Sequence, residues 1–175
     1  MSITKEYTGF LLQSQDYKEA DKKITLLTQD GLMYCQLKGV KKSGAKLKAA
    51  GLPFACGLYT INTSVITSFV SLYEFDWLSD DYDTFVYANI ACEICLHSAL
   101  GNDCGAILGI LLNFFKDILA SDVSTAMKTF MKKILTQIGF QKNFEKYTIP
   151  MLLAEFETNA EIGLKSTSCL VATPK

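Results

Sequence analysis

Lysine side chains concentrate in one short stretch of this sequence. KGVKKSGAKLK, residues 38–48, holds five lysines in eleven residues. Residues 1–50 carry nine Lys against five Asp or Glu, a net charge of +4, whereas residues 51–175 carry eight against thirteen, a net of −5. A segregated positive patch is typical of a phosphate-binding surface, although most charge runs are solvated loops. The candidate phosphate-binding residues are Lys38, Lys41, Lys42, Lys46, Lys48, Lys22 and Lys23.

The kind of basic residue limits what this patch can recognise. All seventeen basic residues are Lys, and the sequence has no Arg. A lysine ammonium is a point charge, whereas the guanidinium of Arg binds a phosphate or a base edge through two parallel hydrogen bonds. We therefore expect attraction to phosphates that does not depend on base sequence.

A second group of reactive residue types is Cys92-Glu93-Ile94-Cys95 with His97 nearby. The pair of thiols suggests half a zinc site or a redox pair, but a structural zinc needs four ligands and only Cys104 follows closely. We favour the interpretation that small apolar thiols line a buried helix face. His97, the single histidine, lies in no known catalytic motif. We predict no catalytic residue, no metal site and no cofactor.

An acidic cluster and three aromatic residues leave alternatives open. Asp16, Glu19 and Asp21 suggest a metal or hydrolase pair, but in YKEADKK they fit better as a hairpin turn whose carboxylates offset adjacent lysines. Aromatic side chains on strands either stack on a nucleic-acid base or join the core. Alternation along the strands does not decide between these roles for Tyr34, Phe54 and Tyr59.

The elements that carry these residues change character along the chain. The first part alternates apolar and polar side chains in short runs bounded by turn residues, with Asp30-Gly31 as a hairpin signal. Five short strands with one long basic connection predict a small closed barrel of the OB-fold type, which binds single-stranded nucleic acid in many proteins. The expected strands are residues 7–13, 23–28, 32–37, 58–62 and 65–73.

From about Tyr82 the apolar period becomes helical, and acidic residues stand at expected helix starts. We expect helices from residue 82 to about 100, over 104–119 and over 124–138, packed as an antiparallel bundle. The tail after Pro150 predicts either a fourth short helix or an irregular segment followed by a strand. The fold class is thus α+β, with an OB-fold domain at 1–80 and a helical domain at 81–175.

Localisation is predicted from two absences in the sequence. The most apolar stretch, residues 106–115, is shorter than the roughly 18 residues that span a membrane. The first ten residues show no signal-peptide pattern. We expect a cytoplasmic protein with reduced thiols and no membrane partner.

Four segments in order resemble the RecO family of recombination mediators. They are residues 14–43 (SQDYKEADKKITLLTQDGLMYCQLKGVKKS), 53–61 (PFACGLYTI), 83–94 (DTFVYANIACEI) and 129–146 (TFMKKILTQIGFQKNFEK). The resemblance covers about residues 4–146. In many members a four-cysteine zinc element follows the last segment, but here Tyr147 stands where a first Cys is expected and no C-x-x-C follows. The chain therefore looks like a short, zinc-free form.

The resemblance implies a DNA-binding mediator that binds single and double strands. It would promote annealing and recombinase loading, contacting the recombinase filament indirectly, with RecR and single-strand-binding protein as partners. An alternative is an adaptor that binds the acidic tail of single-strand-binding protein, with little DNA binding of its own. Its candidate partner-binding residues are Lys128, Lys132 and Lys133, although lysines at this helical spacing usually lie on a solvated face. An enzyme is the least supported class.

Overall fold

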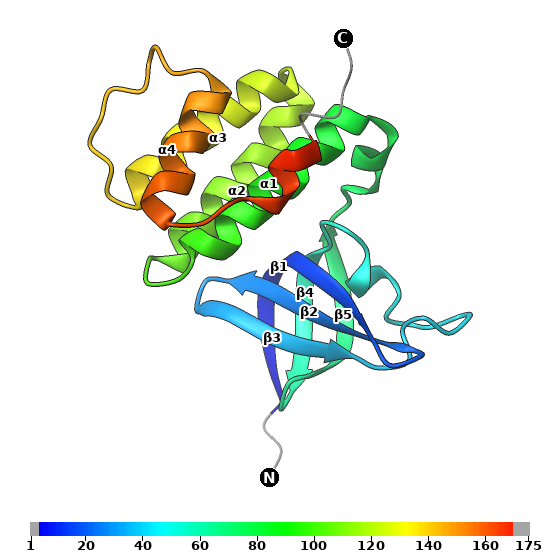
Figure 1. Cartoon of the computed structure of the whole chain (residues 1–175). Helices are drawn as coiled ribbons and strands as arrows, with labels where there is room; N and C mark the ends of the chain where they lie inside the picture. The colour runs from blue at the N-terminus through cyan, green and yellow to red at the C-terminus, as the bar shows by residue number, and fades with distance from the viewer. Residues whose placement is uncertain (1–3, 170–175) are drawn as a thin grey trace. The chain divides into compact units, whose positions relative to one another are not determined.

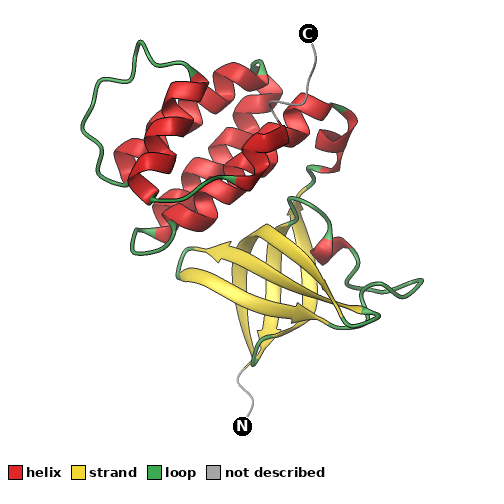
Figure 2. Cartoon of the chain, viewed as in Figure 1, coloured by secondary structure: helices red, strands yellow, loops and turns green. Residues whose placement is uncertain are grey.

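The structure, a computed structural model, describes residues 4–169. Contacts divide the chain between Trp77 and Leu78 into two compact units. All of the long strands precede the α-helices, as Figures 1 and 2 show. This order confirms the predicted α+β fold, an OB-type barrel followed by a helical bundle.

The first unit is a closed barrel of five strands. They are β1 (Thr4–Tyr17), β2 (Asp21–Thr28), β3 (Gly31–Leu37), β4 (Cys56–Asn62) and β5 (Val65–Tyr73), hydrogen-bonded in the order β1-β2-β3-β5-β4. Strands β3 and β5 are parallel and are joined at one pair, Gln36 and Val65. The remaining pairs are antiparallel, and β4 closes the barrel against β1. A short 3-10 helix, η1 (Ala49–Gly51), lies in the long connection from β3 to β4.

Strand β1 is longer than the predicted residues 7–13 because it pairs along both of its edges. Residues 4–10 pair with β4, and residues 9–17 pair with β2. A register shift between Leu11 and Gln13 marks a bulge. A bulge of this kind bends a strand and increases its twist, which lets one strand contribute to both sides of a barrel.

The barrel is held together by apolar side chains that point inward from every strand. The most deeply buried ones include Ile24, Leu26, Leu37, Tyr59 and Ile66. The Tyr59 ring lies 4.7 Å from that of Phe69, and its hydroxyl donates to the Ala55 carbonyl at 3.2 Å. Burial raises the pKa of Tyr59 far above its ordinary value, so this phenol stays neutral.

The second unit contains four α-helices, preceded by the 3-10 helix η2 (Asp76–Asp80). The α-helices are α1 (Tyr82–Ser98), α2 (Cys104–Ala120), α3 (Val123–Gln137) and α4 (Ile149–Ala160). An aspartate caps each of the first three by accepting a backbone N–H of the first turn, as predicted for Asp81 and Asp122, and Asp103 does the same for α2. Their core is aromatic and aliphatic, with Phe114, Phe115 and Phe130 almost fully buried. None of the described helices is long and apolar enough to cross a membrane.

The tail follows the first of the two predicted alternatives. Pro150 stands in the first turn of α4, where its missing N–H costs no helical hydrogen bond. A short 3-10 helix, η3 (Lys165–Cys169), comes next, and Glu93 of α1 accepts the N–H groups of Lys165 and Ser166 at 2.8 Å each. Residues 170–175, where the tail prediction also extends, lie outside the described part of the chain.

Candidate nucleic-acid interface

Strand register places a set of polar side chains on one outer face of the barrel. The β2–β3 hairpin turns at Asp30-Gly31, as expected, and pairs Thr25 with Tyr34 and Lys23 with Gln36. On the other edge of β2, Thr25 pairs with Gln13 and Lys23 pairs with Gln15. Side chains two residues apart on a strand share a face, so three strands present two adjacent polar rows. These rows are Gln13, Thr25 and Tyr34, then Gln15, Lys23 and Gln36.

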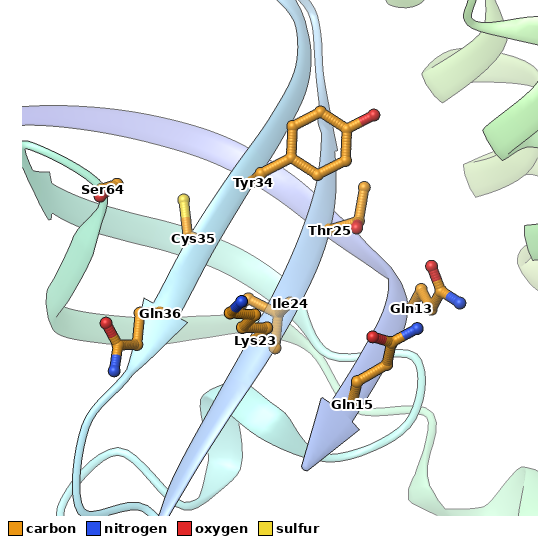
Figure 3. Close-up of a pocket in the computed structure, with 9 residues that line it drawn as sticks. All are labelled: Gln13, Gln15, Lys23, Ile24, Thr25, Tyr34, Cys35, Gln36 and Ser64. Atoms are coloured by element: carbon orange, nitrogen blue, oxygen red, sulfur yellow. The ribbon is translucent and has the colours of Figure 1, made fainter. Parts of the chain in front are cut away.

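The two rows border an open groove of about 460 Å³. Figure 3 shows the Tyr34 ring extending from β3 towards Thr25, with Gln13 and Gln15 on the neighbouring strand. Ser64, in the turn between β4 and β5, completes the lining beside Gln36. The OB-fold face formed by the second and third strands and the turn between the last two is where many such barrels bind oligonucleotides. We call this surface the β2–β3 groove, lined by Gln13, Gln15, Lys23, Ile24, Thr25, Tyr34, Cys35, Gln36 and Ser64.

The three aromatic residues left open by the sequence take different roles. Tyr59 is fully buried in the barrel, and Phe54 is 5% exposed, so both belong to the interior. Tyr34 is 67% exposed on the groove. Of these three, Tyr34 is therefore the one whose ring is available for stacking on a base.

The electrostatic character of the groove is mildly positive. Of the described residues that line it, Lys23 alone carries a charge. The Lys23 ammonium lies 4.2 Å from the centre of the Tyr17 ring, a cation–π contact that holds it beside the groove. Burial raises the pKa of Cys35, also in the lining, to about 11, so this thiol is protonated and unreactive at neutral pH.

The predicted lysines divide between the sheet and the β3–β4 connection. Figure 1 shows this connection reaching away from the barrel beside the turn between β1 and β2. Within residues 4–169 no side-chain hydrogen bond or ion pair engages the exposed ammonium groups of Lys38, Lys42, Lys46 and Lys48. Lys22, in contrast, donates to the Gly51 carbonyl at 3.3 Å, and Lys41 pairs with Asp16 at 2.9 Å.

The acidic turn ties the start of this connection to the barrel. Asp21 accepts the Gly39 N–H at 2.8 Å and the Gln36 side-chain amide at 2.9 Å, while the Lys41 N–H donates to Ala20. The hydrogen bond and charge of Lys41 lower the pKa of Asp16, and the Gly39 N–H lowers that of Asp21. These carboxylates offset nearby lysines, which agrees with the predicted turn role of the cluster.

The lysines of α3 behave differently from those of the barrel. Lys132 pairs with Glu145 at 3.2 Å, and Lys128 donates to the Glu145 carbonyl at 3.4 Å. Both lysines contact the segment between α3 and α4. Lys128 and Lys132 are half-buried, whereas Lys133, the third predicted partner-binding lysine, is exposed. The candidate partner site therefore has one lysine that is not already engaged within the chain.

The Cys92–Cys95 pair lies inside the helical unit. Both thiols are buried in α1, and burial raises the pKa of each well above its ordinary value. No group of three or more metal-ligating side chains occurs within the described residues. Such buried, protonated thiols behave as small apolar core residues.

The sequence did not predict the groove, although its polar residues show a pattern along the strands. Gln13 and Gln15, Lys23 and Thr25, and Tyr34 and Gln36 are pairs at i and i+2 on successive strands. Joining them requires the register of both strand pairs, which depends on the hairpin turn and on the β1 bulge.

Comparison with known proteins gives consistent matches. Residues 1–76 match the family model described as "Recombination protein O N terminal". A protein named "DNA repair protein RecO" from Clostridium novyi (strain NT) is 32% identical over 161 residues, covering 81% of this chain and 58% of that protein. The protein of the same name from Clostridium kluyveri is 30% identical over 145 residues, covering 78% of this chain and 56% of its own length. The chain thus spans somewhat more than half the length of these relatives.

Proposed function

The chain belongs to the RecO family of DNA repair proteins, and from that premise we propose that it is a recombination and repair mediator that binds DNA through its barrel. In this proposal it binds single and double strands without sequence specificity in the cytoplasm. It promotes annealing and recombinase loading together with RecR and single-strand-binding protein. The phosphate contacts come from Lys38, Lys41, Lys42, Lys46, Lys48, Lys22 and Lys23.

The observation that carries the proposal is the group of unengaged lysines on the β3–β4 connection. Lys42, Lys46 and Lys48 are exposed on one short segment that a series of backbone turns keeps compact. Its first part is fastened to the β1–β2 turn through Asp21 and Gly39. An ordered segment with free ammonium groups supports binding to a polyanion, since less conformational freedom is lost when the complex forms.

The salt dependence of DNA affinity tests this proposal. If about four lysines contact phosphates of a single strand, log affinity against log salt should have a slope near −3, because each contact contributes about −0.7. Replacing Lys42, Lys46 and Lys48 by Ala should reduce the steepness by about 2. Fluorescence anisotropy with a labelled oligonucleotide over a range of salt concentrations measures both values.

A matched control uses three exposed lysines of the helical unit. Replacing Lys133, Lys146 and Lys165 by Ala changes the net charge by the same amount and should leave the slope nearly unchanged. A salt-independent affinity, or equal effects of the two triple variants, would contradict phosphate binding by the connection.

The adaptor alternative has a separate test. Lys133 is exposed on α3 while Lys128 and Lys132 engage Glu145, so the structure supports this alternative less than DNA binding. Calorimetric titration of an acidic, Phe-ending tail peptide into the chain should show weak binding that Lys133→Ala reduces. Tight peptide binding without DNA binding would favour the adaptor over the mediator.

A further inference from the structure

We infer that the β2–β3 groove binds an unpaired base of single-stranded DNA, stacked on Tyr34, with Lys23 on an adjacent phosphate. This inference rests on the proposed DNA binding and adds a second site to it. The lysines of the connection attract phosphates of either kind of DNA, whereas the groove selects strands whose bases are free to leave the stack.

The side chain of Tyr34 is exposed on the outer face of the barrel. Tyr34 occupies the middle of β3, and the residue is 67% exposed on a polar face. Its cross-strand neighbour, Thr25, is only 7% exposed and pairs in turn with Gln13, and all three residues line the groove. A flat aromatic ring that is open on a sheet face is the platform on which single-strand-binding barrels stack bases.

Lys23 brings a positive charge to the same face as Tyr34. Lys23 is the diagonal neighbour of Tyr34 across the β2–β3 pair, and such neighbours lie about 7–8 Å apart, within reach of long side chains. A single nucleotide spans that distance from base to phosphate. The Lys23 ammonium contacts Tyr17, one register row beyond Lys23 on the side away from Tyr34, so it is placed for a phosphate at that end of the groove, next to a nucleotide whose base lies on Tyr34.

Three glutamines contribute to the polar lining of the groove. Gln13, Gln15 and Gln36 each carry an amide donor and a carbonyl acceptor, which together match the edge of any base. Gln36 is held in place by Asp21, to which it donates at 2.9 Å. An acidic peptide would need several cations, but Lys23 is the one charge among the described lining residues.

Stacking on Tyr34 requires a base whose face is uncovered, which distinguishes single strands from duplexes. In a duplex the faces of the bases are covered by their neighbours, and a protein can reach only base edges and phosphates. A ring on the sheet surface can stack only on a base that has left the helix. The groove should therefore contribute to single-strand affinity and not to duplex affinity.

Anisotropy measurements on the full chain test the inference with three probes of equal length: a single strand, its duplex and an abasic strand. Tyr34→Ala should weaken binding of the single strand about 5- to 150-fold, the range expected for one stacked base, and Tyr34→Phe should leave it nearly unchanged. Binding of the duplex and of the abasic strand should be unaffected by either substitution.

Several outcomes would overturn the inference. An unchanged single-strand affinity for Tyr34→Ala, while the Lys42, Lys46 and Lys48 triple variant still weakens it, removes the base site and leaves the proposed function. An equal loss for all three probes shows that Tyr34 does not recognise a base. No binding of any probe by the parent chain overturns both proposals. An acidic peptide that displaces the strand only when Tyr34 is present assigns the groove to a protein partner.

A second measurement does not depend on truncating the side chain. Tyr34→Trp adds an indole at the same position, and the parent chain with Trp77 is the reference. The added emission should be quenched by the single strand and not by the abasic strand, since stacking brings the base into contact with the indole. Equal quenching by both strands would contradict stacking.

Discussion

Tyr34 and Tyr59 show how the same residue type takes opposite roles in one barrel. Tyr34 stands outside the sheet in register with Thr25, where water covers most of its ring. Tyr59 points into the barrel against Phe69, and its buried hydroxyl is satisfied by the Ala55 carbonyl. Successive side chains of a strand alternate between faces, so the position within the strand decides the role and the residue type does not.

Gly57 is the residue whose replacement should most directly strain the barrel. A Cβ at this position would lie 2.2 Å from the Val70 carbonyl oxygen, which belongs to the backbone of β5. Gly57→Ala should lower the free energy of unfolding by about 2 to 3 kcal/mol, because the strands must separate to accept the methyl group. Urea unfolding followed by fluorescence and circular dichroism measures this loss.

The matched control is Gly9, which pairs with Gly57 across β1 and β4. A Cβ there would meet its nearest neighbour, Thr28 Cγ2, at 3.4 Å, an ordinary contact. Gly9→Ala should therefore change stability by less than about 1 kcal/mol. Equal effects at both positions would show that the close approach of β5 is not the cause.

At the scale of elements, the β3–β4 connection combines order with accessibility. It leaves β3 beside the β1–β2 turn, where Asp21 holds Gly39, and it returns at η1, where Lys22 holds Gly51. Between these anchors, successive turns bond residues 39 to 42, 42 to 45 and 45 to 48. The lysines are thus presented by a fastened segment, and acidic residues at its base do not cover Lys42, Lys46 or Lys48.

The two anchoring carboxylates should respond differently to the loss of Lys41. The pKa of both Asp16 and Asp21 is lowered, chiefly by the Lys41 side chain for Asp16 and by the Gly39 N–H for Asp21. Lys41→Ala should return the pKa of Asp16 towards its ordinary value of about 3.9 and leave that of Asp21 low. Carboxyl chemical shifts followed by NMR over an acid titration measure both.

The sign of the pH dependence follows from these lowered values. A carboxyl whose pKa is lower in the folded state stabilises that state above its ordinary pKa, and the contribution disappears as pH falls through the folded value. The contacts of Asp16 with Lys41 and of Asp21 with Gly39 should hold at neutral pH and weaken in acid below about pH 4. An anchor that loosens above pH 5 would contradict this assignment.

At the scale of the whole molecule, charge is distributed unevenly between the two units. Residues 1–77 carry nine Lys and seven Asp or Glu, a net of +2, and residues 78–175 carry eight and eleven, a net of −3. The difference in net charge between the two units is smaller than the difference in net charge between residues 1–50 and residues 51–175. Attraction to a polyanion should therefore come from the local lysine segment and not from the field of a strongly basic domain.

DNA affinity should be nearly independent of pH between about 6 and 8 at constant salt. Lysine and carboxyl groups ordinarily titrate outside that range. The single histidine, His97, lies on α1 of the helical unit and not on the barrel. The dissociation constants from anisotropy titrations at several pH values should agree within about twofold. A clear rise in affinity towards pH 6 that His97→Gln abolishes would place DNA on the helical unit.

The sequence alone determined the elements, their order and the type of fold. A hydrophobic period of two residues indicated strands and a period near four indicated helices. Asp30-Gly31 located a hairpin, Asp81 and Asp122 marked helix starts, and Gly101-Asn102-Asp103 marked the end of the first helix. These are local signals, in which each residue acts on its own neighbours along the chain. The exposed lysines of residues 38–48 were likewise visible as a local excess of charge.

Only the tertiary structure decided which of these residues come together. The groove needs Gln13, Lys23 and Tyr34 from three strands, and their alignment depends on the β1 bulge and on the pairing of both edges of β2. The tertiary structure also distinguishes Lys41, which pairs with Asp16, from Lys42, which does not. It likewise distinguishes the exposed Tyr34 from the buried Tyr59. Such differences arise from contacts between residues far apart in the sequence, and a shift of one residue in register would move every side chain to the opposite face.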